Sequence, residues 1–138
     1  MLDEKRPALV AIIEDDAGSR HALGRLLLAA GFEPSLFDSA EAFIASESGR
    51  AWLCLIVDVT LPGMSGTDLQ QKLRREGSDV PIIITTGNRA DIIRERAQLA
   101  GCLAFLWKPF TSDTVLELLG SISRQTHPDP KDVCTNGQ

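Results

Sequence analysis

The sequence predicts a single α/β domain built around a parallel β-sheet, and three observations support this fold class. Short apolar runs rich in β-branched residues alternate with amphipathic segments at nearly regular intervals, which is typical of repeated βα units. The length of 138 residues suits one domain with its own core. Hydrophobic residues make up 43% and charged residues 24% of the chain, as in globular proteins. Five βα units are therefore expected.

Five short apolar runs are predicted as strands. They are Leu9 to Ile13, Glu33 to Phe37, Trp52 to Asp58, Val80 to Thr86 and Cys102 to Leu106. The third and fourth runs contain LCLIVD and VPIIIT, which are apolar at successive positions. Strands that are covered on both faces show this pattern. These two strands are therefore expected in the centre of the sheet.

The first two helices are predicted from apolar spacing and from capping residues. Apolar positions of the first helix recur at helical spacing at Ala22, Leu23, Leu26, Leu27 and Ala30. Gly31 follows them and is predicted as the C-cap. Ser39 precedes the segment AEAFIAS, in which Glu41 is predicted to complete a capping arrangement.

Three further helices follow the third, fourth and fifth strands. Leu69 and Leu73 mark a helix that ends near Gly77. The next helix contains Ile93, Ala97 and Ala100 and is ended by Gly101. The last helix begins near Ser112 or Asp113 and is expected to bury Val115, Leu118, Leu119 and Ile122. Residues 1–124 thus form the predicted domain, and the polar segment 125–138, with two prolines, is predicted to be a disordered tail.

Charge and cysteine content exclude several classes of protein. A net charge of −5 argues against a nucleic-acid-binding surface, because phosphate contacts need clustered Lys and Arg. The chain has no apolar run near the ~18 residues of a membrane span and no secretory signal. Cys54, Cys102 and Cys134 form neither an even set nor a CxxC pair, so reduced thiols are expected. A cytoplasmic protein with no membrane and no direct nucleic-acid partner is predicted.

Polar residues gather where the predicted strands end. In an open parallel sheet, ligands bind beyond the carboxyl ends of the strands. The first strand is followed by the acidic run Glu14, Asp15, Asp16, and the third strand ends in Asp58. Thr86 ends the fourth strand, and Lys108 follows the fifth. Asp16 lies one residue beyond the acidic pair and is expected to face the start of the following helix.

These residue types predict phosphoryl chemistry at a magnesium site. Clustered carboxylates repel one another and favour binding of a proton or a cation. Hard oxygen ligands without His or Cys favour Mg²⁺, which commonly shares its shell with a phosphate. Lys108 can neutralise one phosphoryl oxygen and Thr86 can donate a hydrogen bond to another. Asp58, on a central strand, is placed to act as the nucleophile.

The residues in this order resemble the receiver domain of two-component response regulators, over residues 7–124. The acidic pair of that family corresponds to Glu14 and Asp15, and its phosphoacceptor to Asp58 in the segment DVTLPGMSG. Its switch hydroxyl, aromatic switch residue and lysine correspond to Thr86, Phe105 and Lys108 of KPF. The LPGMSG loop and the Thr-Gly pair after the fourth strand are most similar to receivers of nitrogen-fixation-type transcriptional regulators.

The resemblance implies a fold, a reaction and partners. The fold is a flavodoxin-like, doubly wound five-stranded sheet of order 2-1-3-4-5. Asp58 accepts a phosphoryl group from a phosphohistidine of a sensor kinase or phosphotransfer protein. Mg²⁺ is held by Glu14, Asp15, Asp58 and the Thr60 carbonyl. The protein modifies itself rather than turning over a metabolite, and the face of the fourth helix, fifth strand and fifth helix serves a homodimer or an effector protein.

One departure from the family pattern leaves alternatives open. Glu14 stands where the family usually has Asp, so a degenerate receiver that binds partners without phosphorylation is one alternative. A haloacid-dehalogenase-type phosphatase is another. That class needs a second acid two residues after the nucleophile, and Thr60 stands there. Either a stand-alone receiver or a piece of a longer protein is compatible with the sequence.

Overall fold

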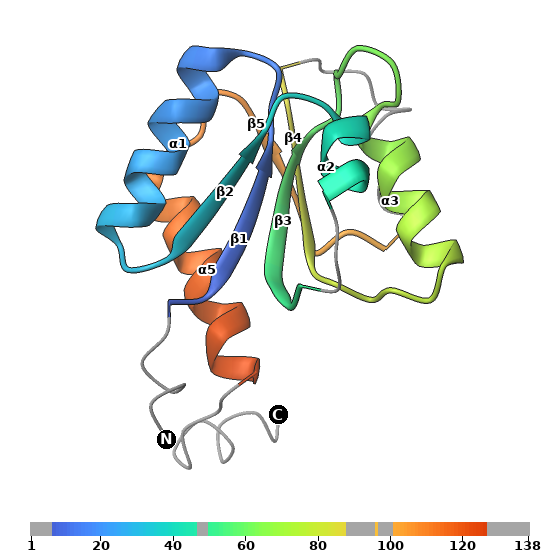
Figure 1. Ribbon diagram of the computed structural model, residues 1–138. Coiled ribbons are helices and arrows are strands. Elements are labelled where there is room, and N and C mark those ends of the chain that lie inside the picture. Colours follow the sequence, from blue (N-terminus) through green and yellow to red (C-terminus); the bar gives the residue numbers. More distant parts are fainter. Residues whose placement is uncertain (1–6, 47–49, 88–95, 97–100, 127–138) are drawn as a thin grey trace.

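A single parallel sheet forms the centre of the molecule in the computed structural model, which describes residues 7–46, 50–87, 96 and 101–126 (Figure 1). The strands lie in the order β2-β1-β3-β4-β5, as predicted. Their bounds are Leu9–Ile13 for β1, Glu33–Phe37 for β2, Trp52–Asp58 for β3, Ile82–Thr86 for β4 and Ala104–Trp107 for β5. β3 is the middle strand and β4 lies beside it, which confirms their predicted central positions.

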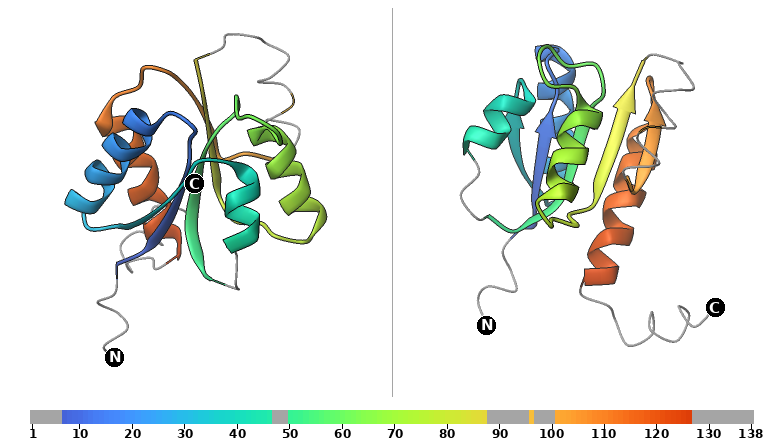
Figure 2. Two further views of the ribbon diagram at one scale, coloured as in Figure 1. Left: turned by 45° about the horizontal axis from the view of Figure 1, so that its top comes forward. Right: turned by 90° about the vertical axis from the view of Figure 1, so that its right-hand side faces the viewer.

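Helices cover both faces of this sheet. Figures 1 and 2 show α1 and α5 on one face and α2 and α3 on the other. Their bounds are Ala17–Ala29 for α1, Ala40–Ser46 for α2, Gly66–Arg75 for α3 and Ser112–Thr126 for α5. The predicted fourth helix falls in 88–100, of which only Arg96 is described. Within the described residues, no helix is both long and apolar enough to cross a membrane.

Each face of the sheet has its own hydrophobic core because the buried strands alternate their side chains between the two faces. On the α2 and α3 side, Leu55, Val57 and Ile84 pack with Phe43 and Leu69. On the opposite side, apolar residues of the strands pack with α1 and α5 through Val10, Ile12, Cys54, Ile56, Leu27, Val115 and Leu119. Burial on both faces explains the continuous apolar runs of the sequence.

Two strand boundaries differ from the prediction. β4 begins at Ile82 rather than Val80, because Pro81 has no N–H to donate to the sheet. The Pro81 carbonyl still accepts from the Leu55 N–H at 3.0 Å. β5 runs from Ala104 to Trp107 rather than from Cys102 to Leu106. Gly101 turns the chain ahead of β5 with φ of 84°, and Cys102 and Leu103 lie between that turn and the strand.

Three details of the helices also correct the prediction. In α1, Ala22 and Ala30 are exposed, and Gly24 is buried instead, because Leu36 of β2 packs against it. Ala30 is the C-cap, and Gly31 comes one position later with φ of 96°. α5 extends to Thr126, two residues into the segment predicted as a tail, and residues 127–138 lie outside the described part.

Candidate functional site

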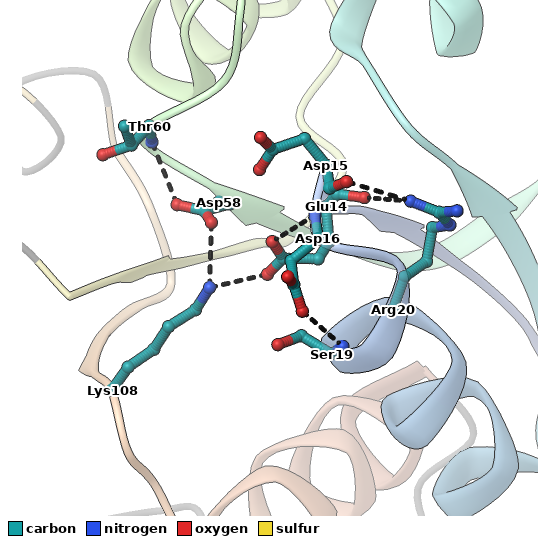
Figure 3. Close-up of polar contacts among 8 residues, drawn as sticks. All are labelled: Glu14, Asp15, Asp16, Ser19, Arg20, Asp58, Thr60 and Lys108. Atoms are coloured by element: carbon teal, nitrogen blue, oxygen red, sulfur yellow. Dashed lines mark hydrogen bonds and ion pairs between the residues drawn. The ribbon is translucent and has the colours of Figure 1, made fainter.

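The carboxyl ends of β1, β3 and β5 bring the predicted polar residues together at one edge of the sheet. Glu14 and Asp15 follow β1, Asp58 ends β3, and Lys108 follows β5 (Figure 3). Parallel pairing produces this convergence, since Ile13 pairs with Val57 and Asp58 pairs with Thr85. The candidate site therefore follows directly from strand register.

Three carboxylates form an acidic cluster at this edge. Glu14, Asp15 and Asp58 each offer one oxygen, and these oxygens lie within 4.8 Å of one another. Glu14 and Asp58 are buried, whereas Asp15 is exposed. Carboxylate oxygens at this spacing suit a small divalent cation that completes its shell with water or phosphate. The cluster fits a metal ion by both donor type and geometry.

Lys108 lies between two of these carboxylates. Its Nζ donates to Glu14 Oε1 at 2.6 Å and to Asp58 Oδ2 at 2.8 Å (Figure 3). Burial alone lowers the pKa of Lys108, but the hydrogen bonds and the attraction of both carboxylates outweigh it and raise that pKa above its usual value. The ammonium is therefore a fixed positive charge beside Asp58. The peptide bond that follows it, Lys108-Pro109, is cis.

Both oxygens of Glu14 are engaged, which the longer side chain makes possible. Oε1 accepts from Lys108, and Oε2 accepts from the Asp16 N–H at 3.1 Å. Burial raises the pKa of Glu14, and the Lys108 hydrogen bond opposes that increase. The sequence pattern did not indicate this ion pair, because its members stand 94 positions apart.

Asp16 has a separate structural role. Its Oδ2 accepts from the Ser19 N–H at 2.8 Å and caps the start of α1. This backbone hydrogen bond lowers the pKa of Asp16. The expectation that Asp16 faces the helix start is confirmed, and the residue belongs to the helix rather than to the acidic cluster.

Asp58 is held firmly by its surroundings. Its Oδ1 accepts from the Thr60 N–H at 2.9 Å, while Oδ2 faces Lys108. The next residue, Val59, donates to the Thr85 carbonyl at 2.8 Å. Gly66 of α3 approaches so closely that an added Cβ would lie 2.5 Å from the Asp58 carbonyl oxygen. The start of α3 therefore requires glycine and locks the end of β3 in place.

Thr86 and Phe105, the predicted switch residues, lie on neighbouring strands. Thr86 is fully buried at the end of β4, and its register partner on β5 is Trp107. The Phe105 and Trp107 rings meet edge to face, with centroids 5.3 Å apart. The Lys108 N–H donates to the Thr86 carbonyl at 2.7 Å. Backbone pairing thus connects Thr86 to Trp107 and Lys108, and the ring contact connects Trp107 to Phe105.

Sequence reasoning missed Arg20, which contacts the site, and it assigned Glu41 a different partner from the observed one. Arg20 of α1 donates through Nη1 to the carbonyls of Glu14 at 2.9 Å and Asp15 at 3.4 Å. No local pattern pointed to it. Glu41 was predicted to cap α2, but Ser39 Oγ alone accepts there, from the Ala42 N–H at 3.0 Å. Glu41 stands one position too early for a capping box and accepts instead from the Met64 N–H.

A cavity of about 550 Å³ adjoins the cluster. Glu14, Asp58 and Lys108 are among its lining residues, and its lining is otherwise mainly apolar. The residues that α1 and the segment after β5 contribute to these walls include Ala22, Leu23, Leu26, Pro109 and Phe110. The cavity lies between α1 and the start of α5, and Asp58 is among its lining residues.

Known proteins share both the sequence and the fold. The transcriptional regulatory protein FixJ of Bradyrhizobium diazoefficiens is 36% identical over 122 residues, which cover 88% of this chain and 60% of that protein. Nodulation protein W of the same organism is 37% identical, with coverage of 90% and 53%. This chain thus spans only about half to three fifths of these relatives.

Solved structures agree with the sequence matches. Full-length FixJ from B. japonicum superposes with a TM-score of 0.80 at 36% identity, covering 88% of this chain and 60% of that one. A CheY-like receiver domain protein from Methanospirillum hungatei reaches 0.81 at 22% identity, covering 89% and 99%, and supports the fold alone. The response regulator receiver domain model matches residues 10–120. With its acidic cluster, its lysine and this match along most of its length, the chain belongs to the receiver domains of two-component response regulators.

Proposed function

We propose that this chain is a cytoplasmic signalling switch that accepts a phosphoryl group on Asp58 from a phosphohistidine of a histidine kinase or phosphotransfer protein. The observation that carries the proposal is the position of the Asp58 carboxylate. The Lys108 ammonium lies 2.8 Å from one oxygen of this carboxylate, and one oxygen each of Glu14 and Asp15 lies within 4.8 Å of an Asp58 oxygen. A nucleophile, a fixed cation and a divalent-ion site at one strand end are the groups that phosphoryl transfer needs.

The transfer itself requires little beyond positioning. A carboxylate oxygen of Asp58 attacks phosphorus, the bond between phosphorus and the imidazole nitrogen breaks, and the imidazole leaves with that electron pair. Thr60 N–H binds one oxygen of Asp58 and so orients the carboxylate. Lys108, already beside Asp58, neutralises charge on the incoming phosphoryl group. The adjoining cavity admits the side chains that flank the phosphohistidine.

Mg²⁺ is the metal we assign to the acidic cluster. Glu14, Asp15 and Asp58 would hold it together with the Thr60 carbonyl, and the hard oxygens of this set fit its preference. When bound, Mg²⁺ supplies positive charge that screens the phosphoryl oxygens from the carboxylates. Both oxygens of Glu14 already accept hydrogen bonds, one from Lys108 and one from the Asp16 N–H, so a metal would share one of them.

The protein modifies only itself in this proposal and turns over no metabolite. Thr60 supplies no carboxyl group two residues after Asp58, and the family match does not favour the phosphatase alternative. Treatment of the chain with acetyl phosphate and Mg²⁺ distinguishes the phosphorylated receiver from the two alternative functions. One adduct per chain is expected. Continuous turnover would indicate a phosphatase, and an unmodified chain would indicate a receiver that works without phosphorylation.

Binding of Mg²⁺ is expected to be at least tenfold weaker in the variant Asp15→Ala. Asp15 offers an exposed carboxylate on the Asp58 side of the site (Figure 3), so its loss removes a ligand without opening the core. Asp16→Asn is the matched control, because it removes a neighbouring charge but keeps a helix-capping side chain. Calorimetric titration measures both. Equal Mg²⁺ affinity in Asp15→Ala and the unaltered chain would remove Asp15 from the site.

Phosphorylation is proposed to act through Thr86 and Phe105. The phosphoryl group draws the Thr86 hydroxyl toward it, and Phe105 turns into the space released. The output surface is the fourth helix, β5 and α5, which would bind a second copy or an effector protein. Phe105 now contacts Trp107, so this movement changes the surroundings of the Trp107 ring.

Trp107 fluorescence is therefore expected to report the switch. The chain has two tryptophans, and Trp52→Phe leaves Trp107 as the single emitter. Addition of beryllofluoride with Mg²⁺ is expected to shift the emission of Trp107, and Thr86→Ala to reduce that shift. Thr86→Ser keeps the hydroxyl and is expected to retain it. A full shift in Thr86→Ala would mean that another residue couples Asp58 to the aromatic pair.

A further inference from the structure

The loop that follows Asp58 is hydrogen-bonded, two residues before α3 begins, to a carboxylate from another part of the fold. This loop, residues 59–65, connects β3 to α3. Oε2 of Glu41, in the first turn of α2, accepts from the Met64 N–H at 2.8 Å. The start of α2 lies beside this loop in Figure 1. Glu41 is exposed, and its carboxylate adds a hydrogen bond to the packing of the half-buried Met64 against the core.

The other hydrogen bonds of the loop lie at its two ends, and the side chains of Leu61 and Met64 pack into the hydrophobic core. At the start, Val59 donates to Thr85 and Thr60 donates to Asp58. At the end, the Gly66 N–H donates to the Val59 carbonyl at 3.1 Å. Among the described residues, Glu41 supplies the only side-chain hydrogen bond that reaches this loop from an element other than β3 or α3.

Gly63 provides a second observation at the same place. Its φ is 75°, a conformation that residues with a side chain rarely adopt. A Cβ at this position would lie 2.6 Å from Glu41 Oε2. The carboxylate thus occupies the space that a side chain at position 63 would need. Both the backbone conformation at Gly63 and the absence of a side chain there accommodate Glu41.

We propose that Glu41 is a positioning residue, whose hydrogen bond to Met64 holds the loop so that the Thr60 carbonyl faces Mg²⁺. This inference rests on the proposed function, because that function assigns the carbonyl to the metal. Gly63 gives the backbone beside Met64 more conformational freedom than a residue with a side chain would. The observed affinity of a site falls with the fraction of molecules whose loop is correctly placed. Glu41 is not needed to cap α2, since Ser39 does so.

Calorimetric titration of the 138-residue chain with Mg²⁺ tests the proposal. Glu41→Ala is expected to weaken Mg²⁺ binding about two- to tenfold, the range that corresponds to one hydrogen bond. Glu41→Gln removes the same charge but keeps an acceptor oxygen, so its affinity is expected to stay within about twofold of the unaltered chain. Glu33→Ala removes an exposed glutamate at the amino end of β2 and is expected to change nothing.

Amide hydrogen exchange gives a readout that is independent of metal binding. Exchange at Met64 is expected to accelerate in Glu41→Ala and not in Glu41→Gln. Gly63→Ala, which displaces the carboxylate, is expected to weaken Mg²⁺ binding as well. In the double variant Glu41→Ala/Gly63→Ala the loss should be smaller than the product of the single losses, because both changes break one contact.

Three results would overturn the proposal. The first is unchanged Mg²⁺ affinity in Glu41→Ala while Met64 exchange accelerates, which would show that the hydrogen bond between Glu41 and Met64 does not affect the metal site. The second is an equal loss in Glu41→Gln, which would show a charge effect. The third is a double-variant loss equal to the product of the single losses. Absence of Mg²⁺ binding in the unaltered chain would contradict the metal site itself, and the proposal with it.

Discussion

Replacing Asp58 with asparagine is expected to abolish phosphorylation while the fold stays intact. Asparagine has nearly the same shape, but its amide oxygen is a poor nucleophile and cannot form a stable acyl phosphate. Its one acceptor oxygen can serve either the Thr60 N–H or Lys108, so one of these hydrogen bonds is lost. That loss costs about 1–2 kcal/mol, far less than the stability of a domain. Glu14 still accepts from Lys108 and limits the damage.

Intact-mass spectrometry after treatment with acetyl phosphate and Mg²⁺ measures this effect. The unaltered chain is expected to gain the mass of one phosphoryl group, and Asp58→Asn to gain none. Asp79→Asn, a change at an exposed aspartate in the loop before β4, is the control and should be modified normally. Circular dichroism shows whether the fold survives. A mass gain that persists in Asp58→Asn would place the acceptor on another residue.

Replacing Lys108 with methionine is expected to destabilise the protein in the absence of Mg²⁺. The ammonium is the partner of two carboxylates whose side chains are 9% and 8% exposed. Removing it leaves those charges facing each other in a buried place, which costs about 2–4 kcal/mol. The burial that raises the pKa of Glu14 would then be opposed by the hydrogen bond from the Asp16 N–H but no longer by the one from Lys108. Phosphorylation by acetyl phosphate should also slow, because the incoming phosphoryl group loses its cation.

Mg²⁺ is expected to restore part of the stability of Lys108→Met, because it binds the folded carboxylates and not the unfolded chain. Urea denaturation with and without Mg²⁺ measures the difference. Lys72→Met is the matched control, since Lys72 of α3 forms a surface ion pair with Glu76, the C-cap of that helix. Such pairs contribute under about 1 kcal/mol. Equal stability losses in the two variants would show that the buried cluster does not depend on Lys108.

The sequence was sufficient to predict the elements and the candidate residues of the site. Apolar runs and glycine or capping positions marked five strands and the described helices, because these signals depend on neighbouring residues. It was less reliable at element ends. The Pro81 ring and the turn at Gly101 shortened β4 and β5 at their starts, and α5 continued past the predicted boundary. The residues at which strands and helices begin and end depend on tertiary contacts as well as on local preference.

By itself, the sequence determined that Glu14, Asp15, Asp58 and Lys108 would meet, because parallel strands place their carboxyl ends at one edge of the sheet. Only the tertiary structure decided which atoms pair there. Glu14 pairs with Lys108, 94 positions away in the sequence, and Glu41 accepts from Met64 of the loop after β3 instead of capping its own helix. These contacts depend on strand register, loop shape and side-chain rotamers, which local patterns do not encode. A pattern specifies the edge at which a residue lies, and packing specifies its partner.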